Sequence, residues 1–148
     1  MMTSSLKSIK ELSQELCSGR TQSRNLVNEA LAKIEDKDGE GIRTMLKVHA
    51  ELARATADNF DSSRKLNIAI SPIAGLPITV KDLFDIAGDV TTAGSKLLQS
   101  APPAVVDAPV IQRLRRAGAI IIGRTNMTEF AYSGLGLNPH YDTPRNPW

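Results

Sequence analysis

Lys81 occupies the position in this sequence that most strongly suggests chemistry. It ends an apolar, extended run, Gly75-Leu-Pro-Ile-Thr-Val-Lys-Asp82, that is typical of a buried strand. In strand alternation Thr79 and Lys81 share one face, so the amine emerges at the carboxyl end of the strand, where α/β proteins place their chemistry. Desolvation disfavours the ammonium form, which would make Lys81 a proton acceptor. A solvated or snorkelling side chain is the alternative.

Other reactive side chains stand alone in the sequence. His49 and His140 are isolated and Cys17 has no local partner, so we expect no metal site, structural or surface roles for both histidines, and a core position for the cysteine. Ser133 lies in Tyr-Ser-Gly-Leu-Gly136, which lacks the first glycine of a nucleophile elbow. The sequence contains neither a dinucleotide fingerprint nor a phosphate loop, so we expect no nucleotide cofactor.

The composition is that of an ordinary globular protein. The chain has 148 residues, of which 41% are hydrophobic and 23% are charged. The net charge of +2, from 18 basic and 16 acidic residues, is too balanced to indicate a nucleic-acid partner. Residues 1–13 carry charges without a continuous apolar stretch, which predicts neither a secretory signal nor a membrane span. One cysteine fits a reducing compartment, so we expect a cytoplasmic protein.

The elements that must position Lys81 begin with helices. Apolar residues recur at helical spacing over residues 6–16 and 23–34, and an alanine-rich, charged segment over residues 51–64 also favours a helix. Residues 44–48 are read as a short extended segment. At Leu66 the sequence changes character, with fewer charges and more β-branched residues. We therefore place the change from a helical layer to a sheet at that point.

A βαβ crossover follows the Lys81 strand. Asp107 is the predicted N-cap of a helix that Gly118 ends, and Ala119-Ile-Ile-Ile122 reads as a central parallel strand covered on both faces. Asn126 and Glu129 have the spacing of a capping box, which predicts a short helix directly afterwards. Residues 125–133 should then lie near Lys81, because neighbouring parallel strands present the same end.

These elements predict an α/β fold in which N-terminal helices precede the start of a mixed, mainly parallel sheet covered by helices. We interpret residues 1–148 as the N-terminal portion of a single domain, with residues 1–65 mainly helical and residues 66–148 forming the first βαβ part of the core sheet. From Gly134 to Trp148 the chain is loop-like. Such a sheet would keep an unpaired apolar edge, so we expect a fragment of a larger domain.

Several segments are informative because of the order in which they occur along the chain. They are Gly75-Leu-Pro-Ile-Thr-Val-Lys-Asp82, Thr91-Thr-Ala-Gly-Ser95, Ala117-Gly-Ala-Ile-Ile-Ile-Gly-Arg-Thr-Asn126, Glu129-Phe130 and Arg145-Asn-Pro-Trp148. Their order and spacing closely resemble the amidase signature family. The resemblance is continuous from about Leu76 to the last residue, while the N-terminal helices match only in general pattern.

The resemblance implies an amidohydrolase that uses a serine nucleophile, a second serine in a cis peptide linkage and a lysine, with no cofactor or metal. Lys81 matches that lysine. Ala131, Tyr132 and Ser133 match a stretch that lines the substrate site in family members, which would hold a small amide. The glycine- and serine-rich segment that carries both serines is absent from this sequence. We therefore expect the 148-residue chain to be inactive alone, truncated before that segment.

Two alternatives remain. The same motifs occur in the glutamine-hydrolysing subunit of a tRNA-dependent amidotransferase, which requires partner subunits, whereas an amidase could form a homodimer. A non-catalytic binding module, in which Lys81 is structural, is the alternative from another class; it leaves the ordered motifs unexplained. In none of these readings does the chain itself bind nucleic acid or a membrane.

Overall fold

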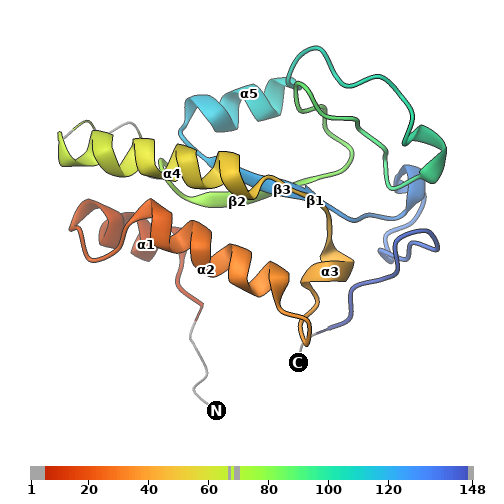
Figure 1. Cartoon of the computed structure of the whole chain (residues 1–148), viewed down its shortest axis with the longest axis horizontal. Coiled ribbons are helices and arrows are strands. Elements are labelled where there is room, and N and C mark those ends of the chain that lie inside the picture. Colours follow the sequence, from red (N-terminus) through yellow and green to blue (C-terminus); the bar gives the residue numbers. More distant parts are fainter. Residues whose placement is uncertain (1–5, 67, 69–70, 147–148) are drawn as a thin grey trace.

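The computed structural model describes residues 6–66, 68 and 71–146 (Figure 1). Pro147 and Trp148, at the end of the last sequence motif, lie outside these residues. In chain order the helices and strands are α1 (Ile9–Cys17), α2 (Ser23–Glu35), α3 (Gly41–Thr44), β1 (Met45–Val48), α4 (Ala50–Lys65), β2 (Pro77–Lys81), α5 (Pro109–Arg116) and β3 (Ile120–Thr125). Two short 3-10 helices, η1 (Lys96–Leu98) and η2 (Glu129–Ala131), lie in the longer connections.

The sheet has three strands in the order β1-β3-β2. β2 and β3 are parallel and joined through α5, which confirms the predicted crossover. β1 pairs with β3 in the antiparallel direction, so the short extended segment predicted from the sequence completes the sheet. The sheet is mixed as expected, although one of its two pairings is parallel rather than most of them.

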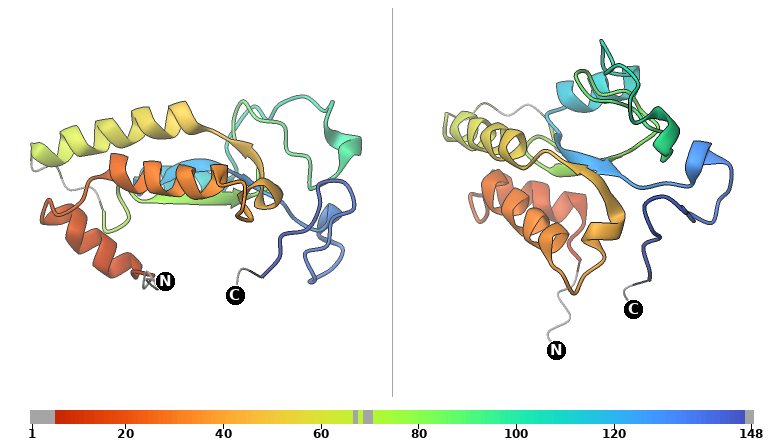
Figure 2. Two further views of the ribbon diagram at one scale, coloured as in Figure 1. Left: turned by 60° about the horizontal axis from the view of Figure 1, so that its bottom comes forward. Right: turned by 45° about the vertical axis from the view of Figure 1, so that its right-hand side comes forward.

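Helices cover both faces of β3, as its continuous apolar run predicts. Figures 1 and 2 show α2 and α4 on one side of the sheet and α5 on the other. One buried cluster joins α2 and α4 to β3 through Val27, Leu31, Ala53, Ala57, Ile120 and Ile122. The other joins α5 to the opposite face through Val80, Ile86, Ile111 and Ile121. The central strand is therefore fixed between two separate hydrophobic layers.

The predicted N-cap of α5 is wrong. The helix starts one residue later, with Ala108 as its N-cap and Pro109 in its first turn. The Asp107 carboxylate instead accepts hydrogen bonds from the Ala87 backbone N–H and from Arg115 Nε, both over 2.8 Å. Asp107 therefore ties the loop after β2 to the helix rather than capping the helix.

The predicted capping box at Asn126 is also wrong. The Asn126 side chain donates to the carbonyls of Arg43 (3.0 Å) and Asp142 (2.9 Å), while Thr128 precedes the short helix η2 without a side-chain cap. Cys17 differs from prediction as well, because it is exposed at the end of α1 rather than buried in the core. For Asp107 and Asn126, local spacing misled because hydrogen bonds to other segments of the chain decide where their side chains lie.

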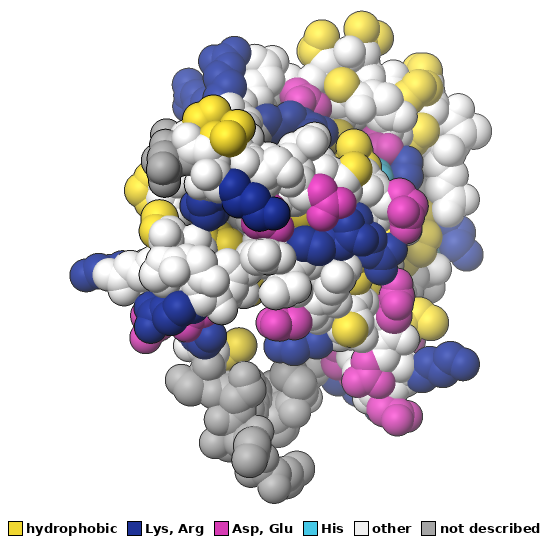
Figure 3. Space-filling model, turned by 60° about the vertical axis from the view of Figure 1, so that its left-hand side comes forward, with side chains coloured by type: hydrophobic (Ala, Val, Ile, Leu, Met, Phe, Trp, Pro, Cys, Tyr) yellow, Lys and Arg dark blue, Asp and Glu magenta, His cyan; other side chains and the backbone are white. Residues whose placement is uncertain are grey.

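The surface carries both signs of charge. On the face shown in Figure 3, basic side chains lie beside acidic ones, with single hydrophobic side chains between them. Across the described ranges, no helix is long and apolar enough to cross a membrane.

Gly123 sets how closely β1 approaches β3. A Cβ at this position would lie 2.2 Å from the Lys47 carbonyl oxygen and 2.7 Å from Met45 Cε. We expect Gly123→Ala to lower the free energy of unfolding by about 1–3 kcal/mol, the usual cost of overpacking. Gly134→Ala is the matched control, because a Cβ there meets nothing within 4 Å. Urea unfolding would measure both, and equal midpoints for the two variants would contradict this view of the β1–β3 contact.

Candidate active site

Lys81 lies at the carboxyl end of β2, where its residue partner in β3 is Thr125. Val80 is buried, whereas Thr79 and Lys81 on the other face are exposed, which confirms the predicted alternation. Among the described residues, the Lys81 side chain has no hydrogen-bond or ion-pair partner. Lys81 is therefore exposed to solvent, and the described residues do not provide the desolvation that the apolar sequence around it suggested.

The segment Ala131, Tyr132 and Ser133 follows the same end of β3 through η2. Ala131 and Tyr132 are exposed, Tyr132 by 90%, and the half-buried Ser133 accepts a hydrogen bond at Oγ from the Leu135 N–H. Lys81 and this segment thus leave the sheet at a common end, as predicted, but no hydrogen bond joins them among the residues placed by the structure.

The backbone just before Tyr132 is strained. Phe130 and Ala131 have φ angles of 53° and 56°, in the left-handed region that side chains other than glycine rarely adopt. Such a residue costs about 1–3 kcal/mol and persists only where its surroundings enforce it. The Phe130 N–H donates to the carbonyl of Ala93, whose φ is also positive at 51°. The Thr91–Ser95 loop therefore holds the segment that leads to Tyr132.

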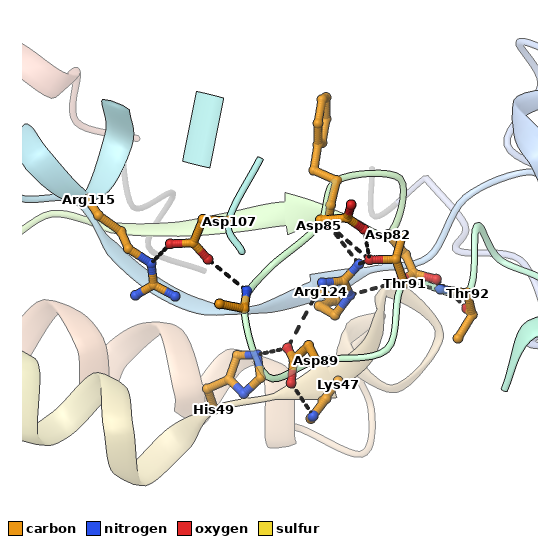
Figure 4. A network of polar contacts seen from close by, with 12 residues as sticks. Lys47, His49, Asp82, Asp85, Asp89, Thr91, Thr92, Asp107, Arg115 and Arg124 are labelled. Atoms are coloured by element: carbon orange, nitrogen blue, oxygen red, sulfur yellow. Dashed lines mark hydrogen bonds and ion pairs between the residues drawn. The ribbon is translucent and has the colours of Figure 1, made fainter. Parts of the chain in front are cut away.

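Asp82, the residue that follows Lys81, forms a buried ion pair with Arg124 of β3 (Figure 4). Each side chain is only 2% exposed, and Arg124 Nε donates to Asp82 Oδ1 over 2.7 Å. Asp82 Oδ2 accepts hydrogen bonds from the Thr92 hydroxyl and, over 3.1 Å, from the Gly94 N–H. Sequence reasoning missed this pair, although a charged residue in the otherwise apolar β3 run signals a buried partner.

Arg124 also reaches the loop that follows Lys81. Its Nη2 donates to the Phe84 carbonyl over 2.9 Å and to the Thr91 hydroxyl over 3.0 Å. One guanidinium from β3 therefore contacts residues near both ends of the loop between Asp82 and Thr92. The planar fork of arginine suits such a junction, because its donors point in fixed, divergent directions.

Asp89 lies at the centre of a second group of ionisable side chains, beside Arg124. Lys47 Nζ donates to Asp89 Oδ1, and His49 Nε2 lies 2.9 Å from Oδ2 without the alignment of a hydrogen bond. Arg124 Nη1 lies 4.0 Å from the same Oδ2. Burial lowers the pKa of His49 because it disfavours the charged imidazolium, and the Asp89 carboxylate opposes that shift. This group links β1 to the loop after β2.

A third polar group fastens the segment after η2. Ser95 Oγ donates to Glu129 Oε1 over 2.5 Å, and His140 Nε2 lies 3.0 Å from the same oxygen. The Ser95 hydrogen bond, followed by the contact with His140, lowers the pKa of Glu129. Buried Asn138 donates to the carbonyls of Gly94 (2.7 Å) and Met127 (2.6 Å). Ser95 therefore joins the Thr91–Ser95 motif to η2 by a hydrogen bond.

One concave region lies beside these groups, and a larger one lies elsewhere on the molecule. A polar cavity of about 370 Å³ opens beside the ion pair, lined by residues that include Lys47, Asp82, Thr92, Gln99, Arg124 and Tyr141. A larger apolar groove of about 590 Å³ runs between α1, α2 and the start of β2, and Lys81 does not line it. In the part of the chain that the structure describes, no group of three or more His, Cys, Asp or Glu side chains could hold a metal ion.

Comparison with known proteins gives one family. The family model named Amidase matches residues 25–148. The AtzE subunit of 1-carboxybiuret hydrolase from Pseudomonas sp. (strain ADP) is 46% identical over 137 residues, which cover 93% of this chain and 30% of that protein. The A subunit of glutamyl-tRNA(Gln) amidotransferase from Chromohalobacter salexigens is 39% identical over 142 residues, covering 96% and 29%. The chain thus spans less than a third of the length of these curated relatives.

A solved structure gives the same result for the fold. The native peptide amidase from Stenotrophomonas maltophilia is similar with a TM-score of 0.83 and 28% identity. The similarity covers 98% of this chain and 31% of that one.

Removal of Arg124 should be severe because it leaves the Asp82 carboxylate buried without its counter-ion. We expect Arg124→Met to lower the free energy of unfolding by about 3–5 kcal/mol. Arg115→Met is the control, since Arg115 pairs with Asp107 but is 41% exposed, and it should cost about 0–1 kcal/mol. Unfolding in guanidinium would measure both variants. A similar loss of unfolding free energy in the two would show that burial of the Asp82–Arg124 pair does not increase the cost of removing the arginine.

Glu129 should make stability depend on pH on the acid side. Its pKa in the folded chain lies below the ordinary value of 4.5, so its contribution is present above that value and is lost as pH falls below it. We expect the free energy of unfolding to fall less between about pH 6 and about pH 3 in Glu129→Gln than in the unaltered chain. Glu35→Gln, at the exposed end of α2, should leave the pH dependence unchanged. Parallel curves for Glu129→Gln and the unaltered chain would refute the assignment.

Proposed function

This chain belongs to the amidase signature family, and on that premise we propose that it contributes the lysine and part of the substrate wall of an amidase acting on linear amide C–N bonds. The observation that carries the proposal is the position of Lys81. It stands at the carboxyl end of a parallel strand, next to Thr125, with the loop of the Thr91–Ser95 motif anchored behind it. Chemistry in α/β folds gathers at such strand ends.

In the proposed reaction Lys81 starts a proton relay. As the neutral amine, it accepts the proton of a bridging serine in a cis linkage, and that serine takes the proton of the nucleophilic serine. The nucleophile attacks the amide carbonyl, backbone amides stabilise the oxyanion, and the relay delivers a proton to the leaving amine or ammonia. Water then hydrolyses the acyl-enzyme.

Both serines and the oxyanion amides would come from a glycine- and serine-rich segment that these 148 residues do not contain. Lys81 is exposed here, and a neutral lysine requires desolvation. We propose that the part of the domain present in the longer relatives, and not spanned by this chain, provides both the serines and the cover. The isolated chain would then not turn over amides, and residues 1–148 would be one portion of a single domain.

The substrate wall would include Ala131, Tyr132 and Ser133. Exposure of Tyr132 and the strained backbone before it support this role, because strain of this kind gathers at ligand contacts. An aromatic side chain there would contact the acyl group of a small amide.

The enzyme would need no metal or cofactor and would act in the cytoplasm, consistent with a single cysteine, which is unpaired.

A second candidate is the glutamine-hydrolysing subunit of a tRNA-dependent amidotransferase. The 39% identity with the A subunit of glutamyl-tRNA(Gln) amidotransferase favours it. The amide chemistry at Lys81 would be the same, but partner subunits would receive the ammonia, whereas an amidase would act alone or as a homodimer. Co-purification with such subunits would favour the amidotransferase.

The proposal can be tested in a hybrid in which this chain replaces the matching segment of the AtzE subunit of the Pseudomonas 1-carboxybiuret hydrolase. We expect the hybrid to hydrolyse 1-carboxybiuret and Lys81→Met to lower kcat by about 10²–10⁴-fold, the range for loss of a general base. Lys65→Met, at the exposed end of α4, should retain the activity, and the isolated 148-residue chain should show none. Circular dichroism would establish that each variant is folded.

Retention of turnover in the folded Lys81→Met hybrid would refute the role of Lys81. Turnover by the purified 148-residue chain would instead refute the need for serines from elsewhere.

A further inference from the structure

We propose that Asp82 and Arg124 are positioning residues for Lys81, and that their buried contact fixes the backbone from which the amine projects. The inference rests on the proposed role of Lys81. It assigns a purpose to the ion pair and to the Thr91–Ser95 motif, neither of which takes part in the relay itself.

Polar contacts among the described residues do not orient the Lys81 side chain. Its side chain is exposed and has no polar partner among the residues that the structure places. No polar contact among the described residues therefore orients its flexible four-carbon stem, so the position of its own backbone determines where the amine can reach. Proton transfer requires donor and acceptor within hydrogen-bond reach, so the backbone at residue 81 must be fixed closely.

The backbone turns sharply at Lys81. The Lys81 carbonyl accepts hydrogen bonds from Leu83 N–H (2.7 Å) and Phe84 N–H (3.2 Å), while the Asp82 N–H donates to the Thr125 carbonyl over 3.1 Å. Lys81 is thus the last residue held by the strand and the first residue of the turn. Any flexibility in this turn would change the position of Lys81.

The contact between Asp82 and Arg124 restrains this turn. Val80 is paired with Arg124 and Lys81 with Thr125, so side chains at 80 and 124 lie on one face of the sheet and Lys81 lies on the other. Arg124 binds the Asp82 carboxylate and the Phe84 carbonyl, the two groups that flank the turn. The ion pair therefore affects Lys81 through the backbone that follows it and does not contact the amine.

The Thr91–Ser95 motif also takes part in this contact. Thr92 donates its hydroxyl to Asp82 Oδ2, and Gly94 donates its N–H to the same oxygen. Gly94 has a φ of +68°, and a Cβ there would lie 2.7 Å from the Met127 carbonyl oxygen, so the loop can close this tightly only with glycine. The motif therefore completes the set of donors that holds Asp82.

Thr92 offers the sharpest test, because its replacement leaves both charges of the ion pair in place and avoids the folding defect expected for Asp82 or Arg124 variants. In the hybrid enzyme we expect Thr92→Val to lower kcat by about 10- to 100-fold, the scale of a small misplacement. KM and the pH profile of kcat should stay unchanged. Thr92→Ser restores the hydroxyl and should recover most of the activity.

Thr56→Val is the matched control, because the Thr56 hydroxyl donates to the Leu52 carbonyl within α4 and contacts neither Asp82 nor Arg124. It should leave kcat unchanged. A purely structural role for Thr92 predicts a lower melting temperature with normal kcat per folded molecule, which would overturn the inference. If Lys81→Met inactivates the hybrid while Thr92→Val does not, only the inference fails; an active Lys81→Met hybrid refutes the proposed function as well.

A second measurement does not depend on activity. Reductive methylation with ¹³C-formaldehyde labels every lysine of the 148-residue chain, and Lys81→Arg identifies the Lys81 signal in the NMR spectrum. We expect Thr92→Val to shift or broaden that signal while those of Lys65 and Lys33 stay in place. A Lys81 signal unchanged by Thr92→Val would overturn the inference even if the hybrid failed to fold.

Discussion

The buried contact between Asp82 and Arg124 is the interaction on which the end of the sheet depends. Two charges removed from water are costly unless the remaining donors and acceptors are also satisfied. Here the Thr91–Gly94 loop and the Phe84 carbonyl supply most of these partners, while Arg124 Nη1 has no hydrogen bond among the described residues and lies 4.0 Å from Asp89 Oδ2. The loop and the strands therefore cannot form independently: the pair needs the loop for its hydrogen bonds, and the loop needs the pair for its shape.

Much of this architecture follows from local patterns. Helical periodicity predicted α2 and α4 within a few residues of their observed bounds, and the apolar run before Gly123 predicted a strand covered on both faces. Alternation along β2 correctly separated Val80 from Lys81. These features were predictable because the pattern of apolar residues in a short segment indicates whether one face or both faces of a helix or strand are buried.

Contacts between distant residues were not predictable in this way. Asp107 and Asn126 have the types and spacing of helix caps, yet each binds groups far away in the sequence, such as Ala87 and Arg43. The antiparallel partner of β1 and the partner of Arg124 were equally hidden. A charge inside an apolar strand does signal that some counter-charge exists, but its identity depends on how the loop returns, which single-sequence patterns do not encode.

The strand order also has a consequence for how the chain folds as it is made. β3 is central but comes last, and Met45 of β1 pairs with Thr125 across most of the chain. Neither outer strand can find its native neighbour until β3 has left the ribosome, and closing so long a loop carries an entropic cost before any pairing repays it. The nascent chain must therefore keep β1 and β2 from wrong associations during synthesis, when only the helices can form.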